Sequence, residues 1–315
     1  MRAHDDASRR HRVRAVRRLL RTGRVEWPTL AVTGATYGGW AAVTVGWRHL
    51  PTAGLLAALA VMTAWHTSLQ HELIHGHPFR RRSWNHALGW LPLSLWIPYG
   101  DYLDLHLAHH HDDRLTDPVD DPESWYLTAE GWAAVGRAGR LVVHINRTLA
   151  GRLAIGPAVS ALAYWRTLTA RDRRRRRHLC HHLAGVAVVL AWLVGVCGMP
   201  LWLYALGGAY LGRSLGLVRS FAEHRWVPGP STRSAVVRAG RFWSLLFLNN
   251  NLHHTHHARP GAPWYRLPVL AHALGSDAAA AAGAGCYTGY GEVARRYLVR
   301  PVGPVVHPAA VEVEV

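Results

Sequence analysis

Hydrophobic residues along the chain are concentrated in two pairs of long segments that are almost free of charge. Residues 28–47 contain no charged side chain, and after a short break at 48–51 the stretch 52–70 is again uncharged. A second pair, 179–198 and 201–218, is separated by a Met-Pro turn and contains one charged residue. Since a helix needs about 20 apolar residues to cross a bilayer, the pattern predicts an all-α integral membrane protein. We expect about four transmembrane helices in two hairpins, with a cytoplasmic helical cap that carries the histidine-rich segments described below.

Two further apolar segments do not fit a spanning helix. Residues 86–100, "HALGWLPLSLWIPYG", are too short and are broken by prolines, so we expect them to lie in or dip into the membrane interface. Residues 149–165 are ambiguous, because Gly156-Pro157 interrupts the run and Arg152 lies inside it. The sequence alone leaves the role of this second segment open.

The charge of the chain is strongly asymmetric. All 36 basic residues of the 315-residue chain are arginines, against 19 acidic residues, and the formal net charge is +17. The predicted turns at 48–51 and 199–200 hold one arginine between them, whereas the N-terminus, residues 71–178 and the segment after 219 hold nearly all the others. Cytoplasmic loops are the ones that carry an excess of basic residues. We therefore expect both termini and the long middle segment to be cytoplasmic. The predicted parts are a basic amphipathic segment on the membrane surface (1–27), a membrane domain (28–270) and a cytoplasmic tail (271–315).

Several other function classes are disfavoured. The run "RDRRRRRHL" at 171–179 is interpreted as a basic patch attracted to anionic headgroups. A nucleic-acid site would need interleaved aromatic residues or a recognisable module, so we expect no nucleic-acid partner. The three cysteines are too far apart in sequence for a disulfide framework or a CxxC zinc site. No short apolar core with a small-residue cleavage site follows the N-terminal arginines, so no cleavable signal peptide is expected.

Histidines recur in three clusters with matching spacing. In "HELIHGHP" at 71–78 two histidines are four residues apart, and in "HLAHHHDD" at 106–113 and "NNNLHHTHHARP" at 249–260 three fall at i, i+3 and i+4. Such residues share one face of a helix, and the expected topology places all three clusters on one side of the membrane. Imidazole suits iron, zinc, copper and nickel. We therefore predict a metal site formed by His71, His75, His106, His109, His110, His253, His256 and His257.

Carboxylates crowd the stretch after the second cluster and adjoin two other histidines. A metal-bound histidine usually donates its other ring N–H to a carboxylate or a carbonyl, which fixes the tautomer. Most acids in "DDRLTDPVDDPES" are nevertheless expected to be ordinary loop residues between proline turns. The residues concerned are Asp112, Asp113, Asp117, Asp120 and Asp121 after the second cluster, Asp101 and Asp104 before it, and Glu72 and Glu223 beside other histidines.

Two remote alternatives to a multi-histidine oxidase site remain. The first cluster matches the HExxH pattern of zinc proteases, including intramembrane ones, with His71 and His75 as ligands and Glu72 as the base. A zinc site needs only about three protein ligands and a water, which leaves the other clusters without a purpose. The second alternative is a non-catalytic membrane protein that binds or carries metal. A transporter would place ionisable groups near the bilayer midplane, whereas these clusters follow the predicted helix ends.

In these motifs and in its hydrophobic layout the chain resembles the membrane fatty acid desaturase superfamily, which includes hydroxylases and carotenoid ketolases. The resemblance covers residues 28–270, and the flanking "LTDPVDDPESWY" and "HARPGAPWYRLP" look like bacterial members. It implies a non-haem di-iron centre with His224 in "RSFAEHRW" as a ninth ligand, at the cytoplasmic end of the fourth helix. Some relatives carry, four residues earlier, an asparagine that holds a metal-bound water, and here that position is Ser220. Outside the matched motifs lie His77, His111 and His254, which are expected to support the ligands or to lie on the surface.

The resemblance also implies a reaction, O2-dependent oxidation of a C–H bond in a long-chain lipid. Fatty acyl desaturation is favoured, and hydroxylation or ketolation of an acyl or carotenoid substrate is the alternative. The sequence contains no haem-binding HPGG, no GxGxxG before a helix and no CxxC, so a separate ferredoxin or cytochrome-type electron donor is expected. The implied location is the bacterial inner membrane. Glycines in the fourth apolar segment, among them Gly207 and Gly212, either leave room for the substrate chain or permit close helix packing.

Overall fold

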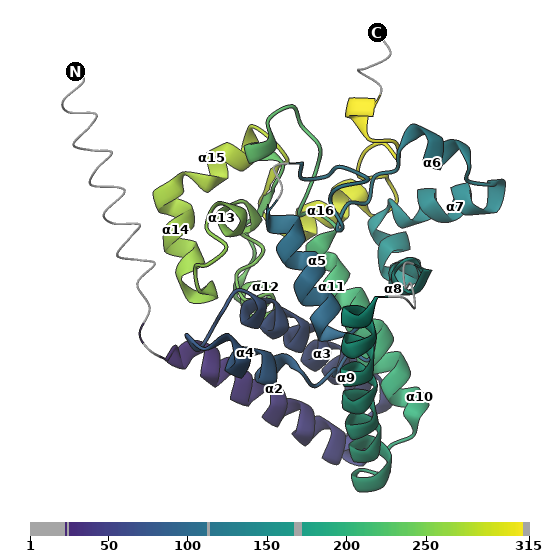
Figure 1. Ribbon diagram of the computed structural model, residues 1–315, viewed down its shortest axis with the longest axis vertical. Helices are drawn as coiled ribbons and strands as arrows, with labels where there is room; N and C mark the ends of the chain where they lie inside the picture. The colour runs from purple at the N-terminus through teal and green to yellow at the C-terminus, as the bar shows by residue number, and fades with distance from the viewer. Residues whose placement is uncertain (1–22, 24, 112–113, 167–171, 311–315) are drawn as a thin grey trace.

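The computed structural model describes residues 23, 25–111, 114–166 and 172–310, and this part of the chain is mostly helical. The longest helices lie together at one end of the molecule, while shorter helices from the middle and C-terminal segments gather at the other end (Figure 1). The basic segment predicted at 1–27 lies almost entirely outside the described residues.

The first predicted helical hairpin is formed by α2 and α3. α2 (Trp27–Val45) has Pro28 in its first turn, where the missing N–H costs no helical hydrogen bond. The short 3₁₀ turn η1 (Trp47–His49) leads to α3 (Thr52–Ile74), which packs along α2. The last half of α3 is almost completely buried, so this helix lies at the centre of the fold.

The second predicted hairpin is also present, and both of its arms contain π-helical turns. One arm is α9 (Arg173–Leu190) with η2 (Ala191–Val196), and the other is α10 (Leu201–Tyr204), η3 (Ala205–Leu211) and α11 (Gly212–Ser220). In the part of the chain that the structure describes, two helices are long and apolar enough to cross a membrane, Thr52–Ile74 and Arg173–Val196.

The turns of the two hairpins lie against each other. The indole N–H of Trp47 donates to the carbonyl of Cys197 (3.0 Å), and the Arg48 guanidinium donates to the carbonyls of Cys197 and Gly198 (3.2 and 3.3 Å). The far end of α3 and the far end of α11 therefore both point away from this pair of turns. His71 and His75 lie at the far end of α3, and His224 follows the far end of α11.

Close contact between α3 and the arm formed by α10, η3 and α11 explains two of the glycines in the fourth apolar segment. A Cβ at Gly212 would lie 1.9 Å from Thr63 Oγ1, and a Cβ at Gly207 would lie 3.1 Å from the backbone of Leu56. The Thr63 hydroxyl also donates to the carbonyl of Gly208 (2.7 Å), which fixes the approach of the two backbones. Helix packing, rather than space for a substrate chain, accounts for Gly207 and Gly212.

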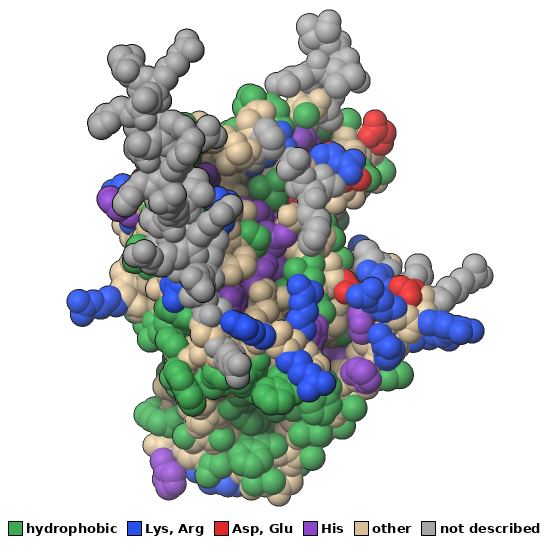
Figure 2. Space-filling model, turned by 60° about the vertical axis from the view of Figure 1, so that its left-hand side comes forward, with side chains coloured by type: hydrophobic (Ala, Val, Ile, Leu, Met, Phe, Trp, Pro, Cys, Tyr) green, Lys and Arg blue, Asp and Glu red, His purple; other side chains and the backbone are tan. Residues whose placement is uncertain are grey.

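Large apolar side chains remain exposed on the long helices. Trp27 is 73% exposed, Trp202 is 62% exposed and Val196 is 66% exposed. On the face shown in Figure 2, hydrophobic side chains cover most of the lower end, and arginines form a band above it. Extended apolar surface of this kind is rare on a soluble monomer and is typical of a surface that contacts another apolar phase.

The middle segment forms five helices, α4 (Arg82–Gly89), α5 (Tyr99–His111), α6 (Ala129–Ala133), α7 (Arg137–Asn146) and α8 (Leu149–Arg166). The proline-rich stretch after α4 contains no further helix before α5. The segment left open by the sequence, 149–165, is one helix that continues through Pro157 and packs against α11.

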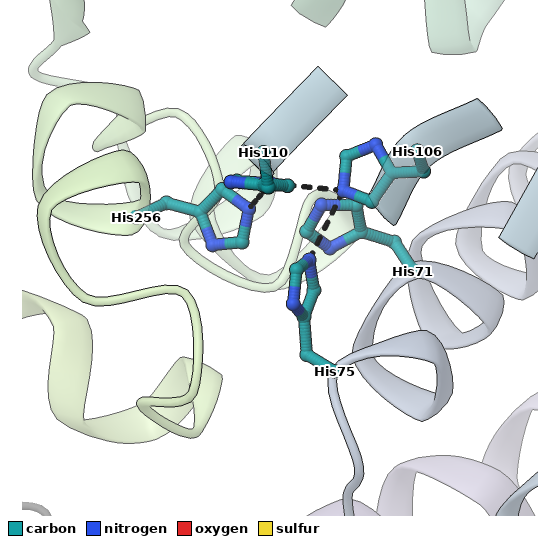
Figure 3. A group of neighbouring side chains, drawn as sticks. All are labelled: His71, His75, His106, His110 and His256. Carbon is teal, nitrogen blue, oxygen red and sulfur yellow. Dashed lines mark hydrogen bonds between the residues drawn. The ribbon is translucent and has the colours of Figure 1, made fainter. Parts of the chain in front are cut away.

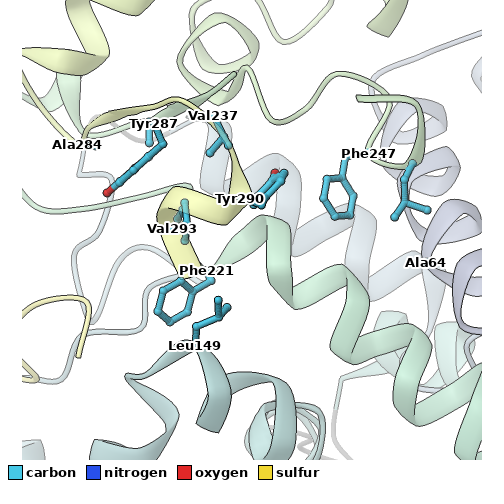
Figure 4. Close-up of a cluster of buried hydrophobic side chains, with 12 residues drawn as sticks. Ala64, Leu149, Phe221, Val237, Phe247, Ala284, Tyr287, Tyr290 and Val293 are labelled. Carbon is cyan, nitrogen blue, oxygen red and sulfur yellow. The ribbon is translucent and has the colours of Figure 1, made fainter. Parts of the chain in front are cut away.

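The C-terminal part is folded against the rest of the molecule as far as residue 310. It contains α12 (Arg241–Leu246), α13 (His253–Ala258), η5 (Trp264–Arg266), α14 (Leu267–Leu274), α15 (Ser276–Ala281), α16 (Tyr290–Tyr297) and the short parallel pair β1 (Val236–Val237) and β2 (Cys286–Tyr287). The sequence predicts a tail from residue 271, whereas Tyr287, Tyr290 and Val293 are buried in one hydrophobic cluster with Phe221 and Phe247 (Figure 4).

Candidate metal centre

All nine histidines singled out from the sequence come together in two adjacent groups. They come from α3 and the residue that caps it, from α5, from α13 and from the segment after α11. Within each group the candidate ligand atoms lie within 4.8 Å of one another. The first group, drawn in Figure 3, is His71, His75, His106, His110 and His256, and the second is His109, His224, His253 and His257.

The spacing of the two HxxHH motifs explains how they divide between the groups. In α5 the i, i+4 pair His106 and His110 faces the first group, and His109 faces the second. In α13 the assignment is reversed, because the i, i+4 pair His253 and His257 belongs to the second group and His256 to the first. Each helix thus serves both groups, and rings from the two groups stack where they meet, with the centroids of His110 and His257 4.3 Å apart.

The ring nitrogens converge at distances that suit ligands of one ion. In the first group the Nε2–Nε2 distances are 3.0 Å for His75 and His106, 3.1 Å for His106 and His110, and 2.9 Å for His110 and His256. In the second they are 3.1 Å between His109 and His224, 2.8 Å between His224 and His253, and 3.1 Å between His253 and His257. Two nitrogens bound at right angles to one ion, each about 2.1 Å from it, lie about 3 Å apart.

Carboxylates fix which nitrogen of the rings carries the proton. His106 Nδ1 lies 2.7 Å from Glu123 Oε1, and His109 Nδ1 lies 2.7 Å from Asp121 Oδ1. An ionised carboxylate only accepts, so each Nδ1 donates and each Nε2 presents a lone pair to its group. Protons can bridge only some of the converging nitrogen pairs, whereas a cation satisfies all of them at once. The donor set therefore fits a metal ion in each group.

Two further residues, Glu123 and Asn250, contact rings of the groups, and the sequence interpretation did not identify them. Glu123, whose Oε1 accepts from His106 Nδ1, lies inside the stretch "DDRLTDPVDDPES" but was not singled out there. Asn250 spans the groups, since its Oδ1 lies 3.1 Å from His253 Nδ1 and its Nδ2 lies 3.3 Å from His71 Nε2. The three asparagines before the third cluster were the only signal in the sequence for this role.

Burial favours the neutral form of His224 and of the histidines of the third cluster. It lowers the pKa of His224 to about 3, and burial together with neighbouring imidazoles holds the pKa values of His253, His256 and His257 well below the ordinary value. Neutral imidazole is the form that binds metal ions. The environment therefore presents His224 and the third cluster in their ligating form at neutral pH.

The remaining candidates are placed as follows. Asp117 accepts backbone N–H groups within its own turn, as expected for a loop acid. His77 is buried and donates to Glu26, and His254 is half-buried. Asp112, Asp113 and the side chain of His111 lie outside the described part of the chain.

The family comparison agrees with this geometry. The sequence model of the family described as "Fatty acid desaturase" matches residues 45–288, a stretch that contains all nine histidines. The chain belongs to the fatty acid desaturase family. A protein named "Fatty acid desaturase" from Bacillus subtilis (strain 168) is 26% identical over 218 residues, which cover 63% of this chain and 61% of the relative. This desaturase-family chain therefore matches about three-fifths of the relative's length.

Glu72, the base of the HExxH alternative, has a different environment in this family member. Its Oε1 accepts the backbone N–H of Trp264 (2.9 Å), and its carboxylate belongs to a separate group with Glu26 and His77. Neither histidine group includes Glu72. The protease interpretation thus has neither family nor geometric support.

Proposed function

We propose that the nine histidines hold two iron ions and that the centre catalyses the O2-dependent oxidation of a C–H bond in a long-chain lipid, by desaturation of a fatty acyl chain. The observation that carries the proposal is the convergence of Nε2 lone pairs, at about 3 Å spacing, in two groups that share α5 and α13. Membership of the desaturase family supports the substrate class.

The donor set supports iron more than the harder ions. Imidazole is a ligand for iron, zinc and copper, whereas magnesium and calcium prefer oxygen. One group offers five candidate ligands and the other offers four, which leaves coordination positions free for small molecules. Reduced iron, when bound, supplies the O2 chemistry that breaks unactivated C–H bonds and that amino-acid side chains lack.

The protein itself orients the ligands and excludes water. Asp121 and Glu123 hold the rings of His109 and His106 in one tautomer, and such supporting partners raise metal affinity. Five of the nine rings belong to residues that are at most 4% exposed, His71, His106, His109, His253 and His256. A dry centre favours oxidation of the lipid over side reactions with water.

The membrane arrangement is part of the proposal. The four long helices of the two hairpins would cross the bilayer, with the contact between Trp47 and Cys197 at the outer end and the histidines at the cytoplasmic end. The apolar surface of the helices would contact lipid, so an acyl chain can approach the centre from the bilayer. Electrons would come from a separate ferredoxin or cytochrome-type donor on the arginine-rich cytoplasmic side, in the bacterial inner membrane.

Lipid profiling tests this function. The chain and its His256→Ala variant are expressed in the same host together with a competent ferredoxin and reductase, and acyl and carotenoid products are compared. New unsaturated acyl chains that require His256 are expected. Products with one added oxygen would assign hydroxylation or ketolation to the same centre. Identical lipid profiles from the two variants would contradict an oxidase function.

A further inference from the structure

A third group of metal-binding side chains lies outside the nine histidines. It consists of Glu26 at the start of α2, Glu72 in the last turn of α3 and His77 in the turn that follows. All three residues are 5% exposed, and each offers a ligand atom within 4.8 Å of the other two. Neither the proposed iron site nor the HExxH motif explains why two carboxylates and an imidazole are buried together.

The hydrogen bonds in this group leave polar atoms without partners. His77 Nδ1 lies 2.8 Å from Glu26 Oε1, which accounts for one ring nitrogen. His77 Nε2 is buried without a hydrogen-bond partner, and the nearest carboxylate oxygen, Oε1 of Glu72, is 4.0 Å away, beyond hydrogen-bond distance. Glu26 Oε2 is also buried without a partner. A buried polar group left unpaired costs about 1–3 kcal/mol, more for a charged one, so the group as it stands is incomplete.

We propose that Glu26, Glu72 and His77 bind a divalent transition-metal ion, separate from the ions of the histidine groups. Two atoms bound to one ion at about 2.0–2.2 Å are at most about 4.4 Å apart, so the 4.0 Å between His77 Nε2 and Glu72 Oε1 is compatible with a shared ion. One imidazole with two carboxylates is a donor set that suits Zn²⁺, Mn²⁺ or Fe²⁺. The positive ion would offset two buried carboxylates.

The site would have a structural role in positioning the first histidine cluster. Glu26 belongs to the start of α2, where its backbone N–H donates to the carbonyl of Pro78 (3.2 Å). Glu72 also accepts from the backbone N–H of Trp264, in the segment that follows the third histidine cluster. An ion here would tie together the start of α2, the end of α3 and the chain after α13, next to His71 and His75.

The test is the metal content of the full-length protein in mild detergent. Wild type, Glu26→Gln and the matched control Glu130→Gln, at an exposed position in α6, are incubated with Zn²⁺, desalted and measured by elemental analysis. Glutamine keeps an oxygen that accepts from His77 Nδ1 but removes the negative charge. We expect Glu26→Gln to hold one metal ion per chain fewer than the other two proteins. Equal metal content in all three would overturn the proposal.

Two further variants separate this site from its alternatives. Glu26→His replaces one metal ligand by another, so a metal site retains the extra ion, whereas a simple Glu–His ion pair would be destroyed. Metal content no higher than that of Glu26→Gln would identify an ion pair instead. His256→Ala/His257→Ala removes one ligand from each histidine group and should retain the ion that depends on Glu26. The metal content of these variants therefore tests the third site separately from the proposed iron centre.

Discussion

Replacing Asp121 by asparagine tests whether a carboxylate controls the second histidine group. Asp121 is buried and accepts three hydrogen bonds. Its Oδ1 accepts from His109 Nδ1 (2.7 Å) and from the backbone N–H of Glu123 (2.9 Å), and its Oδ2 accepts from the backbone N–H of Thr116 (2.8 Å). Asparagine has the same shape but only one accepting oxygen. In either orientation of the amide, at least one of these donors loses its acceptor.

The expected magnitude follows from these contacts. A hydrogen bond to a charged group contributes about 1.5–3 kcal/mol, and loss of a supporting partner lowers metal affinity by about 10–100-fold. If the amide N–H₂ faces His109, it also favours the tautomer with the proton on Nε2, which removes the lone pair that the metal needs. Asp121→Asn should therefore weaken metal binding at the second group by at least about tenfold.

The assay is a chelator competition in detergent that follows loss of iron from the purified protein. The matched control is Asp120→Asn, because Asp120 is a neighbouring loop acid that pairs with Arg114 and not with a histidine. We expect Asp121→Asn to release iron at a lower chelator concentration, while Asp120→Asn behaves as wild type. If the two variants released iron at the same chelator concentration, the carboxylate would have no role in orienting His109.

Three further predictions concern pH, packing and topology. The pKa of His224 is about 3 and those of His253, His256 and His257 are lowered too, so these folded-state values lie below the unfolded value of about 6.5. The stability gained by keeping these histidines neutral in the folded protein is fully present above pH about 6.5 and is lost as the pH falls toward 3. The metal-free protein should therefore melt at a lower temperature at pH about 5.5 than at pH about 7.5. Gly212→Ala should destabilise the fold by about 1–3 kcal/mol in a thermal unfolding assay, because its Cβ would lie 1.9 Å from Thr63 Oγ1. Gly216→Ala is the control, since a Cβ there meets no atom within 4 Å. Reporter fusions in the turns at 48–51 and 199–200 should both report the same side of the membrane, and a fusion at the C-terminus should report the other side. If the two turns reported different sides, the result would contradict their observed contact.

Eight of the nine candidate ligands were predicted from their spacing, which is a local property, whereas His224 was implied only by the family resemblance. An i, i+4 pair must lie on one side of a helix, so the clusters at 71–75, 106–110 and 253–257 are recognisable without tertiary information. Which group each ring joins depends on how α5 and α13 cross, and the sequence holds no sign of that. The roles of Glu123 and Asn250 depend in the same way on loop geometry.

The fold was predictable where hydrophobicity is continuous. The four long apolar segments stand out as helices because Arg213 is the one charged side chain in them. The segment after residue 270 does not stand out, because its buried residues, such as Tyr287 and Val293, are separated by small and charged ones. Pro157 weakened the prediction for α8, but contacts with α11 hold the helix together through it. His77 looked peripheral because its partner Glu26 is distant in sequence.

If nine histidines hold two irons, as proposed, the irons can be counted in the purified protein. Wild type and His256→Ala/His257→Ala, a variant that loses one candidate ligand from each group, are expressed with iron, washed with the same mild chelator and analysed for iron, zinc and protein. We predict that wild type retains two irons per chain more than the variant. A difference of one ion or none, or zinc in place of iron, would contradict a di-iron centre held by these histidines.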